Sequence, residues 1–293
     1  GTSLTINHPI VVGGTLSMQG GNVQNGSHNL TLGLHGTQTG TLDYQSGIIT
    51  GVMQRWVTPA GDNGREVLFP VGTATHYRPI SLQFDNLTNS GTLTTQFVSE
   101  DPGDSGLPLE EDGVTVTQAF PEGYWPVTRT NGFSFSGNYD VKLVADGFST
   151  FSLDTSNRVI VRTGPANDWQ LAGDHVNAMD TLIQRNNVSG NIYQFGISSG
   201  AACEVQLSGC PADITQANDP GLCTAAVNWV APTVSGTCSG ITVSSSHDPG
   251  DTFPVGITAV QYIASDLYGN GDTCTFDVII TDEESPNITT CPS

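Results

Sequence analysis

Apolar and polar residues alternate along most of this chain in short runs, which is the pattern of β-strands with one buried face. Between about Val52 and Gly200 the clearest runs are PISLQF, GTLTTQFVSE, NYDVKLVADGF, NRVIVRTG and NIYQFGIS. Turns rich in Gly, Pro, Asn and Asp separate these runs, and no window of helical length lacks Gly, Pro or β-branched stretches. The pattern predicts an all-β chain with a β-sandwich at residues 51–200.

Residues 1–50 show shorter alternations, which glycines interrupt at fairly regular intervals. This spacing favours a β-roll or the end of a β-solenoid, in which each strand pairs with the next coil. A meander of hairpins is the alternative. Because a solenoid coil cannot bury its apolar face alone, we expect the first coil to continue into sequence upstream of Gly1.

Three tryptophans, Trp56, Trp125 and Trp169, fall within or beside the strands of residues 51–200. Clustered aromatic side chains are usually core packing and only sometimes a platform for sugars. We therefore expect all three to lie in or against the core of the sandwich.

The stretch VMQRWVTPAGDNGREVLFPVGTATHYRPISL contains Arg-Trp, Phe-Pro-Val-Gly and Tyr-Arg-Pro landmarks. It resembles non-catalytic regions of giant secreted or cell-surface proteins of Bacteroidota. Its Arg55 and Arg78 are scarce cations in an acidic chain, so we expect each to pair with a carboxylate such as Glu66 or Asp85.

The charge of the chain excludes several classes of partner. Lys and Arg together number 8 against 28 Asp and Glu, for a formal net charge of -20. A nucleic-acid binder needs a basic face, and an anionic membrane surface would repel this chain. No run approaches the roughly 20 apolar residues of a membrane helix, so we expect no direct membrane insertion. Divalent cations are the natural partners of so acidic a surface, although a solvated acidic face is the alternative.

Residues 210–282 contain a set of ordered landmarks: Cys210-Pro211, an Asp-Pro-Gly turn at 219–221, Trp229, Phe-Pro-Val-Gly at 253–256 and Cys-Thr-Phe at 274–276. In this order they closely resemble the hyalin repeat, an immunoglobulin-like module found in tandem in extracellular proteins. The resemblance implies an immunoglobulin-like β-sandwich after a linker at residues 201–209. It also implies that residues 283–293, with Cys291-Pro292, form a junction and the start of a further repeat.

The alternation in the last two runs of this module predicts which side chains face its core. One face of the last strand would carry Cys274, Phe276, Val278 and Ile280, and one face of the strand before it would carry Val260, Tyr262 and Ala264.

The disulfide pairing depends on the strand order that the resemblance implies. In an immunoglobulin-like order the first strand lies beside the last, which implies one bond between Cys210 and Cys274 and another between Cys223 and Cys238. Four cysteines allow three connectivities, so the choice rests on that order. Two cysteines are left over and could pair outside the chain, namely Cys203 and Cys291.

The same order implies that several carboxylates converge where the last strand of the module ends. Calcium takes six to eight oxygen ligands in flexible geometry and would suit such a cluster. No Asp-x-Asp-x-Asp-Gly spacing is present, and solvated surface acids are the alternative. The candidate calcium ligands are Asp219, Asp248, Asp251, Asp282 and Glu283.

The tetrad Gly-Asp-Ser-Gly at residues 103–106 resembles the nucleophile loop of trypsin-like proteases. The match fails at the next residue, Leu107, and no histidine has the setting that such proteases use. We expect a turn between strands here. The chain also lacks H-E-x-x-H, P-loop and G-x-S-x-G motifs, so we expect no catalytic residue.

These features favour a non-enzymatic structural or adhesive segment, an adhesin or stalk, of a large extracellular or cell-surface multidomain protein. The expected partners are neighbouring modules of the same longer chain, surface glycans or other cell-surface proteins. The alternatives are a carbohydrate-binding module group, which exposed tryptophans would favour, and an accessory region of a secreted hydrolase.

Overall fold

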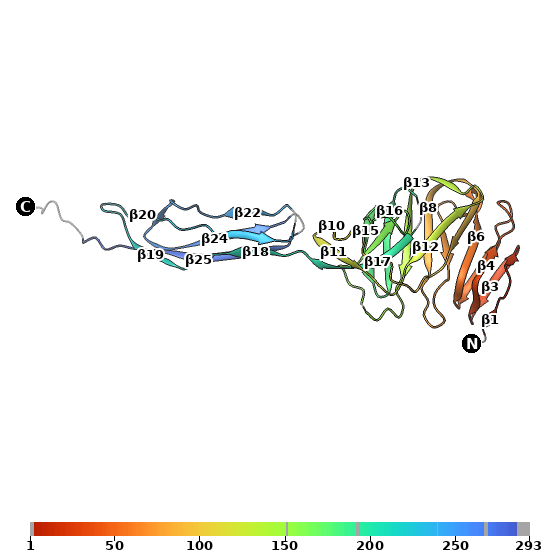
Figure 1. Ribbon diagram of the computed structural model, residues 1–293. Coiled ribbons are helices and arrows are strands. Elements are labelled where there is room, and N and C mark those ends of the chain that lie inside the picture. Colours follow the sequence, from red (N-terminus) through yellow and green to blue (C-terminus); the bar gives the residue numbers. More distant parts are fainter. Residues whose placement is uncertain (1–2, 151, 192–193, 239, 267–268, 286–293) are drawn as a thin grey trace, which may run out of the picture. The chain divides into compact units, whose positions relative to one another are not determined.

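The computed structural model describes residues 3–150, 152–191, 194–238, 240–266 and 269–285. The chain divides into two compact units (Figure 1): unit 1 comprises residues 1–111 and 116–201, and unit 2 comprises residues 112–115 and 202–293. Both are built from β-strands, and the described residues include one short helix, α1 (Pro59–Asp62). The predicted all-β class is confirmed. No helix in this described part of the chain is long and apolar enough to cross a membrane.

Unit 1 contains two main sheets. The larger sheet follows the order β1-β4-β6-β9-β12-β17-β11-β10, with β2 also paired to β4 and β14 to β17. Its strands are β1 (Leu4–Thr5), β2 (Ile10–Val12), β4 (Val23–Leu32), β6 (Ile49–Val57), β9 (Gly91–Thr95), β10 (Leu109–Glu111), β11 (Val114–Ala119), β12 (Trp125–Thr130), β14 (Arg158–Arg162) and β17 (Gln194–Ala202).

The second sheet of unit 1 follows the order β15-β16-β13-β8-β7. Its strands are β7 (Glu66–Phe69), β8 (Ile80–Asn89), β13 (Ser134–Val144), β15 (Asp174–Met179) and β16 (Leu182–Val188). A separate two-stranded ladder joins β3 (Thr15–Gln19) to β5 (Thr41–Ser46). Side chains of the two main sheets share one hydrophobic core, as the ring contact between Tyr139 on β13 and Phe195 on β17 illustrates.

The first strands of unit 1 pair in parallel. Both β1 and β2 pair with β4 in parallel, β4 pairs with β6 in parallel, and β3 pairs with β5 in parallel. Such ladders join successive coils, as in a solenoid, whereas a meander would place antiparallel hairpins here. Strand β6 then pairs antiparallel with β9, and residues 1–50 lie in the same compact unit as residues 51–111 and 116–200 (Figure 1).

The core of unit 1 is rich in aromatic side chains. Trp125 and Trp169 are almost completely buried, as expected, and Trp56 is half-buried. The indole of Trp125 donates a hydrogen bond of 2.8 Å to the carbonyl of Arg78, which satisfies its one polar group inside the core. None of these three tryptophans offers an exposed platform.

The expected pairing of Arg55 and Arg78 with carboxylates is wrong. The guanidinium of Arg55 donates to the carbonyl of Leu68. That of Arg78 donates to the carbonyls of Asp146 and Gly147 and lies over two phenylalanine rings. Both side chains lie beside aromatic rings and donate to backbone carbonyls, which are favourable contacts for a planar guanidinium in the absence of a carboxylate.

Unit 2 is a smaller β-module. One sheet follows the order β19-β25-β24-β22, and two ladders pair β18 with β21 and β20 with β23. The strands are β18 (Val205–Ser208), β19 (Ile214–Ala217), β20 (Thr224–Ala226), β21 (Thr233–Gly236), β22 (Thr242–Ser245), β23 (Thr252–Pro254), β24 (Gly256–Ser265) and β25 (Gly271–Thr281).

The two long strands of unit 2 carry its core. All of the residues that the alternation assigned to the inward faces of β24 and β25 are buried, namely Val260, Tyr262, Ala264, Cys274, Phe276, Val278 and Ile280. Strand β19 pairs with β25 in parallel, which is the expected neighbourhood of first and last strands. The period of two therefore predicted both inward faces correctly.

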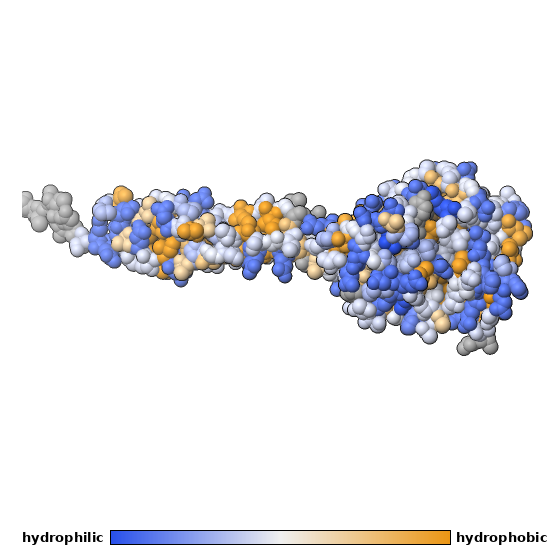
Figure 2. All heavy atoms as spheres, viewed as in Figure 1, coloured by the Kyte–Doolittle hydropathy of each residue, from blue (hydrophilic) through white to orange (hydrophobic). Residues whose placement is uncertain are grey.

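Hydrophobic side chains interrupt the visible face of unit 2 in separate groups, whereas hydrophilic side chains cover most of the visible face of unit 1 (Figure 2). Apolar residues that are scattered in this way are normal on a protein surface and do not by themselves define a docking site. Among the described residues of unit 2, the large exposed apolar side chains are those of Leu222, Val230, Val234, Val243, Val255, Ile257 and Ile263.

Candidate functional site

The candidate site is the path by which the chain enters and leaves unit 2. At the start of β25 the backbone N–H of Leu207 donates to a carboxylate oxygen of Asp272 at 2.8 Å, which holds the incoming strand β18 there. At the far end of β25 the backbone N–H of Asn218 donates to the carbonyl of Thr281 at 2.9 Å. Strand β25 has 11 residues. At about 3.3 Å per residue these two ends are separated by roughly 35 Å.

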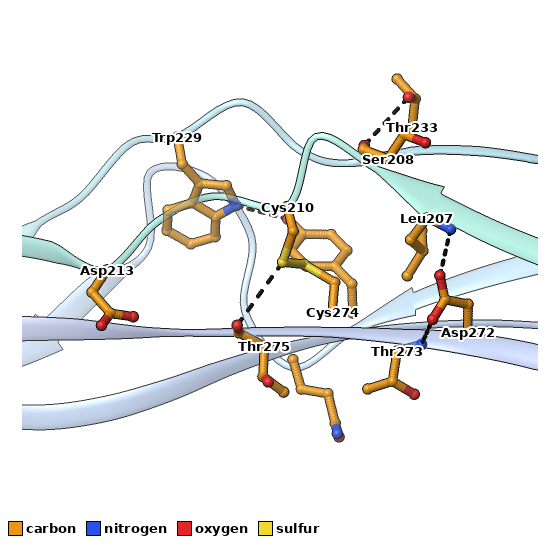
Figure 3. The surroundings of a disulfide bond; sticks show 12 residues. Leu207, Ser208, Cys210, Asp213, Trp229, Thr233, Asp272, Thr273, Cys274 and Thr275 are labelled. Atoms are coloured by element: carbon orange, nitrogen blue, oxygen red, sulfur yellow. Dashed lines mark hydrogen bonds between the residues drawn. A yellow bond between two sulfur atoms is a disulfide. The ribbon is translucent and has the colours of Figure 1, made fainter.

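A disulfide between Cys210 and Cys274 connects the incoming segment to β25 (Figure 3). Their Cα atoms lie 5.8 Å apart, within the usual range for a disulfide. Beside the bond, the indole of Trp229 donates to the hydroxyl of Tyr262 at 2.8 Å and packs edge-on against Phe276. This is the pair that the immunoglobulin-like strand order implied.

After Cys210 the incoming segment continues along β25. The backbone N–H of Asp277 donates to the carboxylate of Asp213 at 2.9 Å, and β19 follows in parallel register from Ile214 opposite Val278 to Ala217 opposite Thr281. Residues 210–217, which include β19, are thus held against β25 by a covalent bond, a side-chain hydrogen bond and a backbone ladder.

The expected bond between Cys223 and Cys238 is wrong, because Cys238 is bonded to Cys203. Strands β18 and β21 pair from Val205 opposite Gly236, and this pairing brings the residues just outside the ladder together at the end where the chain enters. Cys223 is a free, exposed thiol at the other end, where its carbonyl accepts the N–H of Val255.

No sequence signal singled out Cys203, because its partner depends on the β18–β21 pairing. The remaining cysteine, Cys291, lies outside the described residues.

A buried carboxylate lies against this second disulfide. One oxygen of Asp266 is 3.6 Å from the sulfur of Cys203, and both oxygens accept hydrogen bonds from Asn270, one from its backbone N–H and one from its side-chain amide. Among the described residues, Cys203, Cys238 and Asp266 form the one group of three metal-ligand atoms within 4.8 Å of one another. Because both sulfurs are in a disulfide, neither is a thiolate that could bind a metal.

The five candidate calcium ligands do not form such a group in the part of the chain that the structure describes. Some of their carboxylates already accept backbone hydrogen bonds, for example Asp219 from Ala226 and Asp251 from Asp248. Asp282 accepts a similar bond from the N–H of Glu284. The remaining two candidates, Asp248 and Glu283, are exposed, and calcium binding stays a prediction.

The Gly-Asp-Ser-Gly loop of unit 1 is a turn with structural contacts. The hydroxyl of Ser105 donates to the carboxylate of Asp168 at 2.6 Å, and the carbonyl of Ser105 accepts the N–H of Trp169. The carboxylate of Asp104 accepts the N–H of Ala119 at 2.7 Å. These bonds join the loop to neighbouring segments, and among the hydrogen bonds of the described residues none links Ser105 to a histidine.

The fold and the covalent links define unit 2 as a disulfide-bonded, all-β module. Residues 206–280 match the family model of the HYR domain. The chain therefore carries a HYR module, as the resemblance to hyalin repeats implied. No solved structure matches the chain.

Three curated relatives show similarity to part of this chain. A stretch of 152 residues, 50% of this chain, is 30% identical to hyalin of Strongylocentrotus purpuratus and covers 12% of that protein. Hyalin of Lytechinus variegatus is 35% identical over 86 residues, which are 29% of this chain and 16% of that protein. The "Sushi, von Willebrand factor type A, EGF and pentraxin domain-containing protein 1" of Rattus norvegicus is 36% identical over 87 residues, 29% of this chain and 2% of that protein. The chain thus spans a small fraction of the relatives it matches.

Proposed function

We propose that this chain is a non-enzymatic structural or adhesive segment of a large extracellular or cell-surface multidomain protein, in which the HYR module is a spacer that transmits mechanical tension. The observation that carries the proposal is the disulfide between Cys210 and Cys274. It joins the segment by which the chain enters the module to the strand by which the chain leaves.

The two ends of the module support a role as a spacer. The chain enters beside Asp272 and leaves beyond Thr281, at opposite ends of β25. Modules with ends so placed can follow one another in line, and each adds about 35 Å of length. The match to a fraction of much larger relatives agrees with a chain of many modules.

The disulfides would keep the module from extending when its ends are pulled. Tension that enters at Cys203 follows the chain to Cys210, crosses to Cys274 and leaves along β25. The bond closes a loop with a sequence separation of 64 residues. At about 3.5 Å per residue, roughly 220 Å of chain lies within this loop and bears no tension. A covalent path of this kind keeps the length of a spacer constant even if the module unfolds.

Two further observations support the proposed extracellular location and the proposed absence of catalysis. Disulfides persist in oxidising compartments, and unit 2 has two of them. The hydroxyl of Ser105 is held by Asp168 in a turn, so the one protease-like tetrad has a structural explanation. A screen with esterase, peptidase and glycosidase substrates should detect no turnover, and turnover that Ser105→Ala abolishes would contradict the non-enzymatic assignment.

Single-molecule stretching of the full chain by its ends tests the load path. All proteins should carry Cys223→Ser, so that no free thiol at that position exchanges with the disulfides. In this background unit 2 should contribute almost no unfolding length. Unit 1 contributes the same length to every variant, because it contains no cysteine.

The disulfide variants should lengthen the chain in a graded way. Loss of the Cys203–Cys238 bond alone should change nothing, because the path through Cys210 and Cys274 is shorter. Loss of Cys210–Cys274 alone should release about 100 Å, because the path then crosses to Cys238 and follows the chain to Cys274. Loss of both bonds should release about 220 Å. Full extension of unit 2 with both bonds present would overturn the proposal.

A further inference from the structure

Unit 1 has a hollow of about 540 Å³ that is lined by the turn between β3 and β4, by β5 with the turn that follows it, and by the loop before β8. Ligand sites of small molecules commonly have volumes of 300 to 1,000 Å³. The aromatic part of its lining is Tyr44 on β5 and Tyr77 from the loop, which are 33 positions apart in the chain. The polar part includes Asn22, Gln45 and Ser46.

The two tyrosine rings form a stacked pair. Their centroids lie 5.7 Å apart and their planes differ by 13°, and both side chains are half-buried. The hydroxyl of Tyr44 donates to the carbonyl of Gly47 at 2.9 Å, which fixes the orientation of its ring. The orientation of the Tyr44 ring is therefore fixed before any ligand arrives, and Tyr77 packs against that ring.

Asn22 holds the rest of the wall. Its amide oxygen accepts the N–H of Ile48 at 3.1 Å, and its amide nitrogen donates to the carbonyl of Ala74 at 3.0 Å. These bonds connect the three segments that line the hollow. A preformed wall lowers the entropic cost of binding.

The lining of this hollow contains no charged residue, although the chain has a formal net charge of -20. Burial raises the pKa of Tyr44 and that of Tyr77, so both hydroxyls remain protonated at neutral pH. Gln45 and Ser46 are exposed, and no hydrogen bond between described residues uses their side chains. A site of aromatic, amide and hydroxyl groups without charge suits a neutral ligand with both apolar and hydroxyl-bearing faces.

We propose that this hollow binds one unit of a neutral saccharide. The apolar C–H face of a sugar ring stacks on the tyrosine pair, and the side chains of Gln45 and Ser46 bind its hydroxyl groups. The site extends the proposed adhesive role and names a chemical class for its target. It lies in unit 1 and does not depend on the disulfides of the HYR module.

Saturation-transfer difference NMR on the full chain tests the site. The probes are methyl glycosides of glucose, galactose, mannose and N-acetylglucosamine at millimolar concentration, with N-acetylneuraminic acid as an anionic control. At least one neutral glycoside should bind. Tyr44→Ala should weaken its binding roughly three- to tenfold, because the stacking surface is lost.

Two further variants separate binding from folding. Tyr44→Phe retains the ring but loses the hydrogen bond to Gly47, so it should bind more tightly than Tyr44→Ala and more weakly than the unchanged chain. The double variant Gln45→Ala/Ser46→Ala alters only exposed side chains, so it should fold normally and bind more weakly. Absence of binding by all four neutral glycosides, binding that all variants retain, or preferred binding of the anionic sugar would each overturn the saccharide site. A failure here leaves the stretching experiment on unit 2 unaffected, and the reverse also holds.

Discussion

Units 1 and 2 are both β-structures, but they are stabilised differently. Unit 1 contains all eight Lys and Arg residues and no cysteine. Its interior contains large aromatic side chains and also arginines such as Arg185. Unit 2 has no lysine or arginine, a smaller core around Phe253 and Phe276, and two disulfides. The larger unit obtains its stability from burial, and the smaller unit adds covalent links, as small exported domains commonly do.

The difference also shows where each unit can tolerate change. In unit 1 the guanidinium of Arg185 binds Glu111 and the carbonyls of Ala172 and Gly173, so one side chain satisfies several buried groups. In unit 2 the acids at the surface have no cationic partner within that unit, and solvent must screen their repulsion. Loss of a single side chain should therefore affect unit 1 most, and loss of covalent links should affect unit 2 most.

The largest effect is expected when both disulfides of unit 2 are removed. Each bond contributes about 2–4 kcal/mol, and two together approach the whole stability of a small domain. Replacement of Cys203, Cys238, Cys210 and Cys274 by serine should unfold unit 2 and leave unit 1 folded. Hydrogen exchange followed by mass spectrometry reports the two units separately. The control is Cys223→Ser, in which the amides of both units should be as protected from exchange as in the unchanged chain. If the four-cysteine variant lost as much protection in unit 1 as in unit 2, the comparison would be contradicted.

A smaller effect, confined to unit 1, is expected for Arg185→Ala. Among the described residues, the substitution leaves Glu111 with Arg158, 3.2 Å away, as its ion-pair partner, and it removes the Arg185 donor from three backbone carbonyls. Breaking a buried pair of this kind should cost about 3 kcal/mol of unfolding free energy, measured by urea unfolding. The matched control is Lys142→Ala, which removes an exposed pair with Glu66 and should cost less than about 1 kcal/mol. Similar losses in both variants would show that burial of the ion pair does not matter.

The smallest effect is a pH dependence of unit 1 that His175 causes. Burial, and then the positive charge of Arg158, lowers the pKa of His175 below its ordinary value. The unfolded chain therefore binds the proton more readily. The contribution of His175 is present above about pH 6.5, the ordinary pKa of histidine, and declines as the pH falls below it. Urea unfolding at pH 7.5 and 5.5 should show a larger loss for the unchanged chain than for His175→Gln, and equal losses would exclude this histidine as the cause.

The residues of unit 2 show how far the sequence alone could lead. The alternation in β24 and β25 predicted the buried positions, because side chains on a strand point to opposite faces with a period of two. The ordered landmarks from Cys210 to Phe276 predicted the HYR module. The partner predicted for Cys238 was wrong. Its actual partner, Cys203, is set by the pairing of β18 with β21, a contact between segments that no periodicity reveals.

In unit 1 the same contrast appears at the arginines. Their scarcity in an acidic chain led to the prediction that Arg55 and Arg78 pair with carboxylates, and this prediction was wrong. Their partners are backbone carbonyls and aromatic rings rather than carboxylates, because the residues that surround them come from distant strands and loops. The stacked pair of Tyr44 and Tyr77 had no signal in the sequence for the same reason.

By itself, the sequence determined the all-β class, the inward faces of the long strands and the presence of the HYR module. These properties depend on local alternation and on the order of residues along the chain. The tertiary structure alone decided which cysteine meets Cys238, what satisfies the buried arginines and where two tyrosines enclose a hollow. Those properties depend on which segments become neighbours, and the packing of the whole chain selects the neighbours.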